Sequence, residues 1–159
     1  MDMVTGNRLY CAMSSAGIMR QAVVQSIHHT SGRSAFQKKL IQQPLMQNVL
    51  ADMVVEVEAA LALGMRVASA IDNSKFNNEE KAFARIGTTI AKYWICKRAP
   101  ALVCEALECH GGMGYIEDSI MPRLYREVPL NSIWEGPGNI MALDVLRALN
   151  NNDLAGKVL

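Results

Sequence analysis

The sequence predicts an all-α domain, an antiparallel four-helix bundle with one short additional helix. Apolar residues recur at steps of three and four through most of the 159 residues, the spacing that gathers them on one face of a helix. No stretch sustains strand-like alternation, and no Asn-Gly or Asp-Gly pair marks a hairpin turn. Half of the residues are apolar, enough for one domain with its own core. We assign residues 1–151 to this domain and expect residues 152–159 to form a frayed tail.

The first two helices follow from this spacing. The first is expected to begin near residues 5–7 and to end before Ser31, with an apolar face of Leu9, Ala12, Ala16, Met19, Val23 and Ile27. The second carries Pro44 in its first turn, where proline is favoured. Steps of four and three then predict a bundle seam made of Met46, Leu50, Met53, Val57, Ala60, Gly64, Val67 and Ile71.

The third helix follows a polar turn at residues 72–78. Asn77 suits the N-cap, and Glu80 three residues later predicts a capping box. The apolar positions of this helix are Phe83, Ile86, Ile90 and Trp94. We expect the helix to continue through Pro100 to about Cys109 and to end at the glycines of residues 111–114.

The C-terminal part predicts one short and one long helix. The short helix is expected over residues 119–127, and the last helix begins near Pro137. Ala142, Leu146 and Leu149 recur at steps of four and three, which predicts that they form its buried face. Four long helices with short links favour an antiparallel arrangement.

Composition argues against several functions. The net charge of +1 gives no electrostatic case for binding nucleic acid or an anionic membrane. No apolar run approaches the roughly 20 residues of a membrane-spanning helix, and the N-terminus has no secretory signal pattern. The four cysteines form no Cys-x-x-Cys pair, which favours reduced, buried thiols and a cytoplasmic protein.

A metal site is not expected. Two adjacent histidines on a helix, His28 and His29, point about 100° apart and do not chelate one ion together. The Glu-x-x-His pairs of metal-binding helical bundles are missing from the sequence.

Three segments are candidates for chemistry. Glu135 stands between Trp134 and a Gly-Pro-Gly turn that leads into the last helix. Such a carboxylate suits a base that removes a proton next to a carbonyl, or it simply favours the positive end of a helix dipole. The glycines of residues 111–114 suit close approach to a phosphate or flavin, or a helix C-cap. Residues 32–36 offer an arginine and an aromatic ring for a phosphate and a flat ring, or a plain surface loop.

Taken together, these segments resemble the C-terminal helical domain of the flavin-dependent acyl-CoA dehydrogenases. The resemblance covers residues 6–150 and is carried by Arg-Ser-Ala-Phe at 33–36, Glu-Cys-His-Gly-Gly-Met-Gly-Tyr at 108–115 and Ile-Trp-Glu-Gly-Pro-Gly-Asn at 133–139. The wording Pro-Arg-Leu-Tyr-Arg-Glu at 122–127 is most similar to the AidB-like branch of the family.

The resemblance implies a role for each matching residue. Glu135 matches the catalytic base that takes the α-proton of an acyl-CoA thioester while a hydride passes to the flavin, and Arg8 matches an arginine on the substrate side. The positions that match contacts to FAD are Arg33, Phe36, Glu108, Gly112 and Asn139, the first two toward the flavin of a neighbouring subunit. Relatives more often carry glutamine at the positions of Glu108 and Asn139.

The same resemblance implies that other parts are needed. The family also has an N-terminal helical domain and a middle β-domain, and the flavin lies between the β-domain and the helical bundle. We therefore expect the 159-residue chain alone to bind FAD weakly and to have little dehydrogenase activity, and we expect a homo-oligomer, a dimer or a tetramer. The alternative is a helical module that serves oligomerisation or interaction without catalysis.

Overall fold

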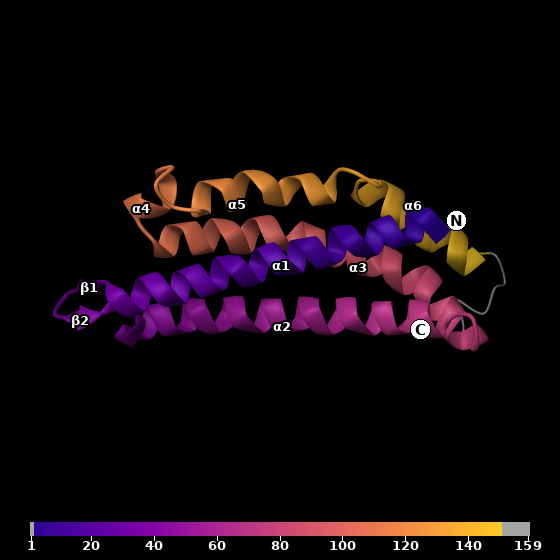
Figure 1. The fold of residues 1–159 in the computed structure, drawn as a ribbon, viewed down its shortest axis with the longest axis horizontal. Coiled ribbons are helices and arrows are strands. Elements are labelled where there is room, and N and C mark those ends of the chain that lie inside the picture. Colours follow the sequence, from indigo (N-terminus) through magenta and orange to yellow (C-terminus); the bar gives the residue numbers. More distant parts are fainter. Residues whose placement is uncertain (1, 151–159) are drawn as a thin grey trace.

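Three long helices form the body of the molecule in the computed structural model, which describes residues 2–150. They are α1 (Asp2–Gly32), α2 (Pro44–Asn73) and α3 (Asn78–Cys109), and they lie side by side along the long axis (Figure 1). At about 1.5 Å per residue, each spans roughly 45 Å. The first helix begins several residues earlier than predicted, and α3 continues through Pro100 as expected. The predicted tail, residues 152–159, lies outside the described residues.

The fourth side of the bundle consists of shorter pieces in series. These are α4 (Gly112–Tyr115), α5 (Met121–Glu127), the 3-10 helix η2 (Val128–Ser132) and α6 (Gly138–Asn150). They run along α3 and α1 on the side opposite α2 (Figure 1). The all-α bundle is thus confirmed, but the fourth position is filled by these segments, and the final helix has only 13 residues.

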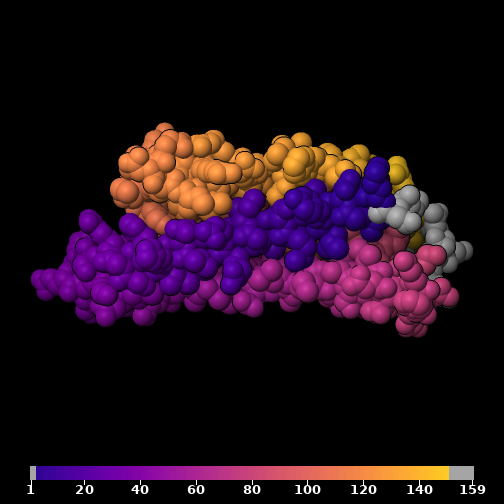
Figure 2. Space-filling view, in the orientation of Figure 1, coloured from indigo at the N-terminus to yellow at the C-terminus, as the bar shows by residue number. Residues whose placement is uncertain are grey.

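The core lies between α1, α2 and α3. The predicted seam of α2 is confirmed, since Leu50, Met53, Val57, Ala60, Gly64 and Val67 are buried and Met46 and Ile71 pack against them. Three cysteines, Cys11, Cys96 and Cys109, are buried free thiols, whereas Cys104 is half-buried. On the face of the molecule drawn in Figure 2, α1 lies across the middle, with α2 below it and residues 112–150 above it.

The start of α3 confirms the predicted N-cap. The side chain of Asn77 accepts hydrogen bonds from the backbone N–H groups of Glu79 and Glu80, at 2.8 and 3.4 Å. The carboxylate of Glu80 accepts two bonds from Arg66 on α2. The predicted N-cap is therefore confirmed, but the capping box is not formed: the N–H of Asn77 donates to the Asn73 carbonyl oxygen, and the Glu80 side chain links α3 to α2.

The predicted buried face of α6 is wrong. Leu146 and Leu149 are 54% and 42% exposed, and the residues that α6 buries are Met141, Asp144 and Ala148. Ion pairs made by Asp144 explain this choice, because a buried carboxylate must keep its charged partners. The helix is therefore turned so that its polar residue faces inward and its leucines face outward.

A small hairpin joins α1 to α2, where the sequence predicts only a loop. Its strands β1 (Ser34–Ala35) and β2 (Lys38–Lys39) pair antiparallel, and the 3-10 helix η1 (Leu40–Gln42) follows. The two turn residues, Phe36 and Gln37, have φ values of 53° and 65°, as a type I′ hairpin turn requires. The turn leaves the Phe36 side chain 92% exposed.

No helix among residues 2–150 combines the length and the apolar character that crossing a membrane requires.

Candidate active site

Glu135 lies in a strained turn between η2 and α6. Its φ is 56°, and that of Gly136 is 105°. The φ of Gly136 lies in a region that L side chains rarely adopt, and a Cβ there would also stand 2.7 Å from the terminal methyl carbon of Met141, so glycine is strongly favoured at this position. A non-glycine residue in the left-handed region costs on the order of 1–3 kcal/mol. The conformation of Glu135 must therefore be stabilised by its surroundings.

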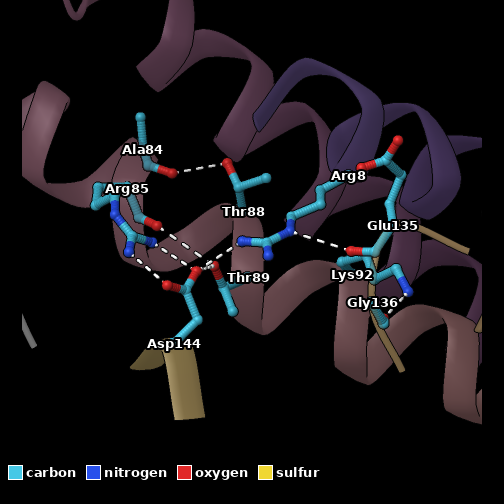
Figure 3. A network of polar contacts seen from close by, with 9 residues as sticks. All are labelled: Arg8, Ala84, Arg85, Thr88, Thr89, Lys92, Glu135, Gly136 and Asp144. Atoms are coloured by element: carbon cyan, nitrogen blue, oxygen red, sulfur yellow. Dashed lines mark hydrogen bonds and ion pairs between the residues drawn. The ribbon is translucent and has the colours of Figure 1, made fainter. Parts of the chain in front are cut away.

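Polar side chains from α1 and α3 hold this turn. The side-chain amide of Asn7 donates to Oε1 of Glu135 at 2.9 Å, and Nε of Arg8 donates to the Glu135 carbonyl oxygen at 3.4 Å. On the other side, Nζ of Lys92 donates to the carbonyl oxygen of Gly136 at 2.5 Å. Figure 3 shows the Glu135 carboxylate pointing away from the two backbone contacts.

Asp144 of α6 is the centre of the neighbouring ion cluster. Its Oδ2 accepts from Nη1 of Arg8 at 2.6 Å, and its two oxygens accept from the guanidinium of Arg85 at 2.6 and 2.8 Å. The Thr89 hydroxyl completes the set at 3.2 Å. Hydrogen bonds from Arg85, with those from Arg8, lower the pKa of Asp144 from 3.8 to about 2. The cluster ties α6 to both α1 and α3 (Figure 3).

Trp134 gives the turn an apolar flank. The indole is 47% exposed, and its Nε1 donates to Oδ1 of the buried Asn131 at 3.1 Å. Ile133, on the same turn, is 62% exposed. The half-buried Glu135 thus follows two large apolar side chains that face solvent, and this exposed apolar surface is available to an apolar ligand or another protein segment.

Three of the residues proposed to contact FAD meet at the opposite end of the bundle. Arg33, Glu108 and Gly112 line one groove of about 690 Å³, together with His29, His110 and Met113. Phe36 is exposed on the adjacent hairpin and does not line this groove. Asn139 is exposed in the first turn of α6, four residues after Glu135. The candidate residues therefore form two groups at the two ends of α1 (Figure 1).

The groove contains a histidine pair that sequence spacing gives no sign of. The ring centroids of His29 and His110 are 4.7 Å apart, and Nδ1 of His110 lies 2.8 Å from the carbonyl oxygen of Ala106. Burial, followed by the nearby His110 and Arg33, lowers the pKa of His29. Among residues 2–150, no three His, Cys, Asp or Glu side chains come together in a way that would hold a metal ion.

The residues present fit part of a dinucleotide. Gly111 and Gly112 have open space where a Cβ would stand, so a ligand can approach the backbone closely, and Arg33 supplies a positive charge at the groove. The negatively charged carboxylate of Glu108 repels a phosphate, but it is a good hydrogen-bond acceptor for a sugar hydroxyl. The donor set therefore suits the nucleoside half of a dinucleotide, with Arg33 toward its phosphates.

Sequence reasoning missed three residues of the Glu135 site: Asn7, Lys92 and Asp144. Asp144 is the one with a readable signal, because it follows Met141 by three residues and precedes Ala148 by four on one helical face. Lys92 falls within the apolar pattern of α3, and a single lysine in such a pattern would be predicted to face solvent. Nothing in the spacing singles out Asn7.

Comparisons with known proteins agree with this architecture. Residues 1–150 match the family described as acyl-CoA dehydrogenase, C-terminal domain. AidB of Escherichia coli K12 is 50% identical over 143 residues, which cover 90% of this chain and 26% of AidB. The mitochondrial short-chain specific acyl-CoA dehydrogenase of Bos taurus is 31% identical over 91% of this chain and 34% of its own length.

A solved structure gives the same picture. The crystal structure of Caenorhabditis elegans ACDH-11 in complex with C11-CoA superimposes with a TM-score of 0.91 at 31% identity, over 94% of this chain and 26% of that one. The chain thus spans about a quarter of AidB and of ACDH-11, and members of the matched family are flavoproteins. With the match over residues 1–150, this chain belongs to the acyl-CoA dehydrogenase family and corresponds to its C-terminal domain.

Proposed function

We propose that this domain supplies the catalytic base for the FAD-dependent α,β-dehydrogenation of an acyl-CoA thioester, and that Glu135 is that base. One observation carries the proposal: the Glu135 carboxylate projects from a left-handed turn that three side chains hold in place. Arg8 and Lys92 donate to the backbone carbonyl oxygens of the turn, and Asn7 donates to Oε1 of Glu135. A carboxylate held at such a cost in backbone strain is typical of functional sites.

The chemistry needs a base in a fixed place. The α-proton of a thioester is weakly acidic, and a positioned general base contributes about 10²–10⁴-fold to its removal. Trp134 and Ile133 precede Glu135 on the same turn and present apolar surface to solvent, which suits an acyl chain. A bound flavin supplies the acceptor for the hydride that leaves the β-carbon.

We place Arg8 on the substrate side of this site. Its guanidinium contacts Asp144 and its Nε contacts the Glu135 carbonyl, so it shapes the substrate side by fixing the backbone that carries the base. Asn139, in the first turn of α6, is proposed to reach the flavin near the reacting groups.

We further propose that Arg33, Phe36, Glu108 and Gly112 bind the adenosine half of FAD that belongs to another subunit. The distance between the two groups supports this, because most of the length of α1 separates the groove from Glu135. Glu135 contacts Asn7 and Arg8, whereas His29 and Arg33 line the groove, so a flavin extending from one group to the other within one chain would have to cross roughly 35 Å of helix. A homo-oligomer, a dimer or a tetramer, brings one chain's groove to a second chain's Glu135.

A second candidate is a helical interaction module without catalysis. The observation that favours it is the outward row of α6, where Ile140, Leu143, Leu146 and Leu149 are each more than 40% exposed. Apolar side chains in such a row usually mark a surface that another protein segment covers. The two functions are compatible, since the proposed enzyme also needs domains and subunits that this chain does not contain.

Substrate-dependent flavin bleaching in a chimera tests the proposal. The chimera joins residues 1–150 to the rest of AidB in place of the matching 143 residues. The protein is loaded with FAD and mixed with a series of straight and branched acyl-CoA thioesters under anaerobic conditions. We expect at least one thioester to bleach the flavin absorbance, and Glu135→Gln to slow that bleaching by at least about 10²-fold.

Glu127→Gln is the matched control, because Glu127 is an exposed carboxylate on α5 in the same part of the chain. It should leave bleaching unchanged. Bleaching that is equally fast in Glu135→Gln, or absent in the FAD-loaded chimera with every thioester, would contradict the enzyme proposal and favour the interaction module.

A further inference from the structure

Lys92 is a buried lysine that the proposed reaction does not use. Its side chain is 1% exposed, and it ranks among the largest fully buried side chains of the described residues. It lies near the middle of α3, and its side chain extends to the turn between η2 and α6. Its Nζ donates to the carbonyl oxygen of Gly136 at 2.5 Å (Figure 3).

Stability alone is a poor reason for a lysine here. Removing an ammonium group from water is costly, and apolar residues of similar volume often replace buried charges without loss of stability. Burial lowers the pKa of Lys92 accordingly, with Cys96, Cys11 and Glu135 opposing the shift and Arg8 adding to it. A methionine would fill the same space, but it would offer no donor to Gly136.

The Gly136 carbonyl needs such a donor. The hydrogen bonds that open α6 are accepted by the next carbonyl along, that of Pro137, which takes the N–H groups of Ile140 and Met141 at 2.9 and 3.2 Å. The Gly136 oxygen is therefore outside the helix and is directed at α3. Gly136 is half-buried, and a carbonyl shielded from water without a partner costs free energy, so the bond from Lys92 supports the conformation of this turn.

Arg8 and Lys92 act on successive carbonyl groups of the turn. The Arg8 Nε holds the oxygen of Glu135 from α1, and the Lys92 Nζ holds the oxygen of Gly136 from α3. Because both oxygens accept from cationic donors, the two successive peptide groups of the turn have fixed orientations. The Glu135 side chain then leaves on the other side (Figure 3), where Asn7 meets its carboxylate.

We propose that Lys92 is a positioning residue for Glu135, which it holds by fixing the Gly136 carbonyl from α3. The proposal rests on the assignment of Glu135 as the base. Lys92 does not contact the reacting atoms, and its effect reaches the carboxylate through the backbone of the turn. Without the hydrogen bond from Lys92, the left-handed turn is free to change conformation. The Glu135 carboxylate then moves away from the position in which it accepts from Asn7.

Hydrogen exchange on the 159-residue chain tests the contact without any activity. Lys92→Met removes the donor at nearly constant volume, and Lys97→Met, on the same helix near Gly138 but exposed, is the matched control. We expect peptides covering residues 133–141 to exchange about tenfold faster in Lys92→Met, with α1 and α2 unchanged. Lys97→Met should match the parent chain. If the methionine variant does not fold, Lys92→Gln replaces it in the test. The glutamine side chain is too short to reach Gly136, so we expect the same faster exchange of residues 133–141.

Steady-state kinetics in the AidB chimera test the positioning role. Lys92→Met should lower kcat at least about tenfold and leave KM for the acyl-CoA within about twofold, the pattern of an interaction that matters only in the transition state. Unchanged exchange of residues 133–141 would overturn the proposal, and so would faster exchange with unchanged kcat. A chimera that bleaches with no thioester would instead overturn the assignment of Glu135, whereas the exchange comparison still decides the Lys92 contact.

Discussion

Arg8 and Asp144 form a 2.6 Å ion pair that joins the beginning of α1 to the middle of α6. The same arginine holds the Glu135 carbonyl, so the pair connects the packing of the last helix to the position of the candidate base. Both side chains are largely buried, at 13% and 12% exposure. The site therefore depends on contacts between segments that lie at opposite ends of the chain.

Asp144→Asn should destabilise the domain substantially. The change leaves the buried guanidinium of Arg8 without its counter-ion, and breaking a buried ion pair from one side typically costs about 3–5 kcal/mol. Denaturant unfolding followed by circular dichroism measures the loss. Asp118→Asn, at an exposed position, should change the free energy of unfolding by less than about 0.5 kcal/mol. Equal effects of the two substitutions would refute this view of the cluster.

The stability of the domain should also fall in acid because of Asp144. Its pKa is lowered from 3.8 to about 2 by Arg85 and Arg8, so the folded state favours the charged form. This stabilisation is complete above pH 3.8 and is lost as the pH falls through about 2. It amounts to roughly 2 kcal/mol. Unfolding curves between about pH 5 and about pH 2, a range that brackets the titration, should show a shallower decline in Asp144→Asn than in the parent. Parallel declines would exclude Asp144 as the source of the acid sensitivity.

Two glycine substitutions should differ in cost. A Cβ at Gly114 would lie 2.2 Å from the backbone oxygen of Leu107, whereas one at Gly64 would lie 2.3 Å from the sulfur of Met13. The methionine side chain can move and the α3 carbonyl cannot, so Gly114→Ala should lower stability by at least about 2 kcal/mol more than Gly64→Ala. Melting temperatures of the two variants decide this, and similar values would show that α4 yields easily.

FAD should bind the isolated 159-residue chain weakly. The groove lined by Arg33, Glu108 and Gly112 lies far from Glu135, and one bundle offers only part of the contacts that a dinucleotide needs. Flavin fluorescence titration should show no binding in the micromolar range. In the AidB chimera, Arg33→Ala should weaken FAD binding about tenfold or more, while Lys75→Ala, on an exposed turn between α2 and α3, should not. Micromolar binding by the chain alone would contradict the need for further domains.

The fold was largely predictable because the three long helices carry strong local signals. The seam of α2 and the Asn77 cap depend on short-range spacing and on backbone hydrogen bonding, both of which sequence expresses directly. The face of α6 was not predictable in this way. Its leucine row is the better apolar stripe, but the long-range pairing of Asp144 with Arg8 and Arg85 decided the orientation.

The candidate site divides in the same manner. Glu135, Arg33 and Glu108 stand in local motifs that resemble those of the family, so the resemblance points to them. Asn7 and Lys92 contact the Glu135 turn only because α1 and α3 pack beside it, and single-sequence patterns carry no record of such packing. The left-handed turn at Phe36 and Gln37 is a similar case, since neither residue favours positive φ on its own.

The most direct test of the account is α-proton exchange of an acyl-CoA thioester in deuterated water, measured by mass spectrometry on the AidB chimera. This exchange reports the base alone, because it requires no net transfer of hydride. We expect deuterium to enter the α-position with the parent chimera and the Glu127→Gln control, and Glu135→Gln to slow its entry at least about 10²-fold. Exchange at the parent rate in Glu135→Gln would contradict the central claim that Glu135 removes the α-proton.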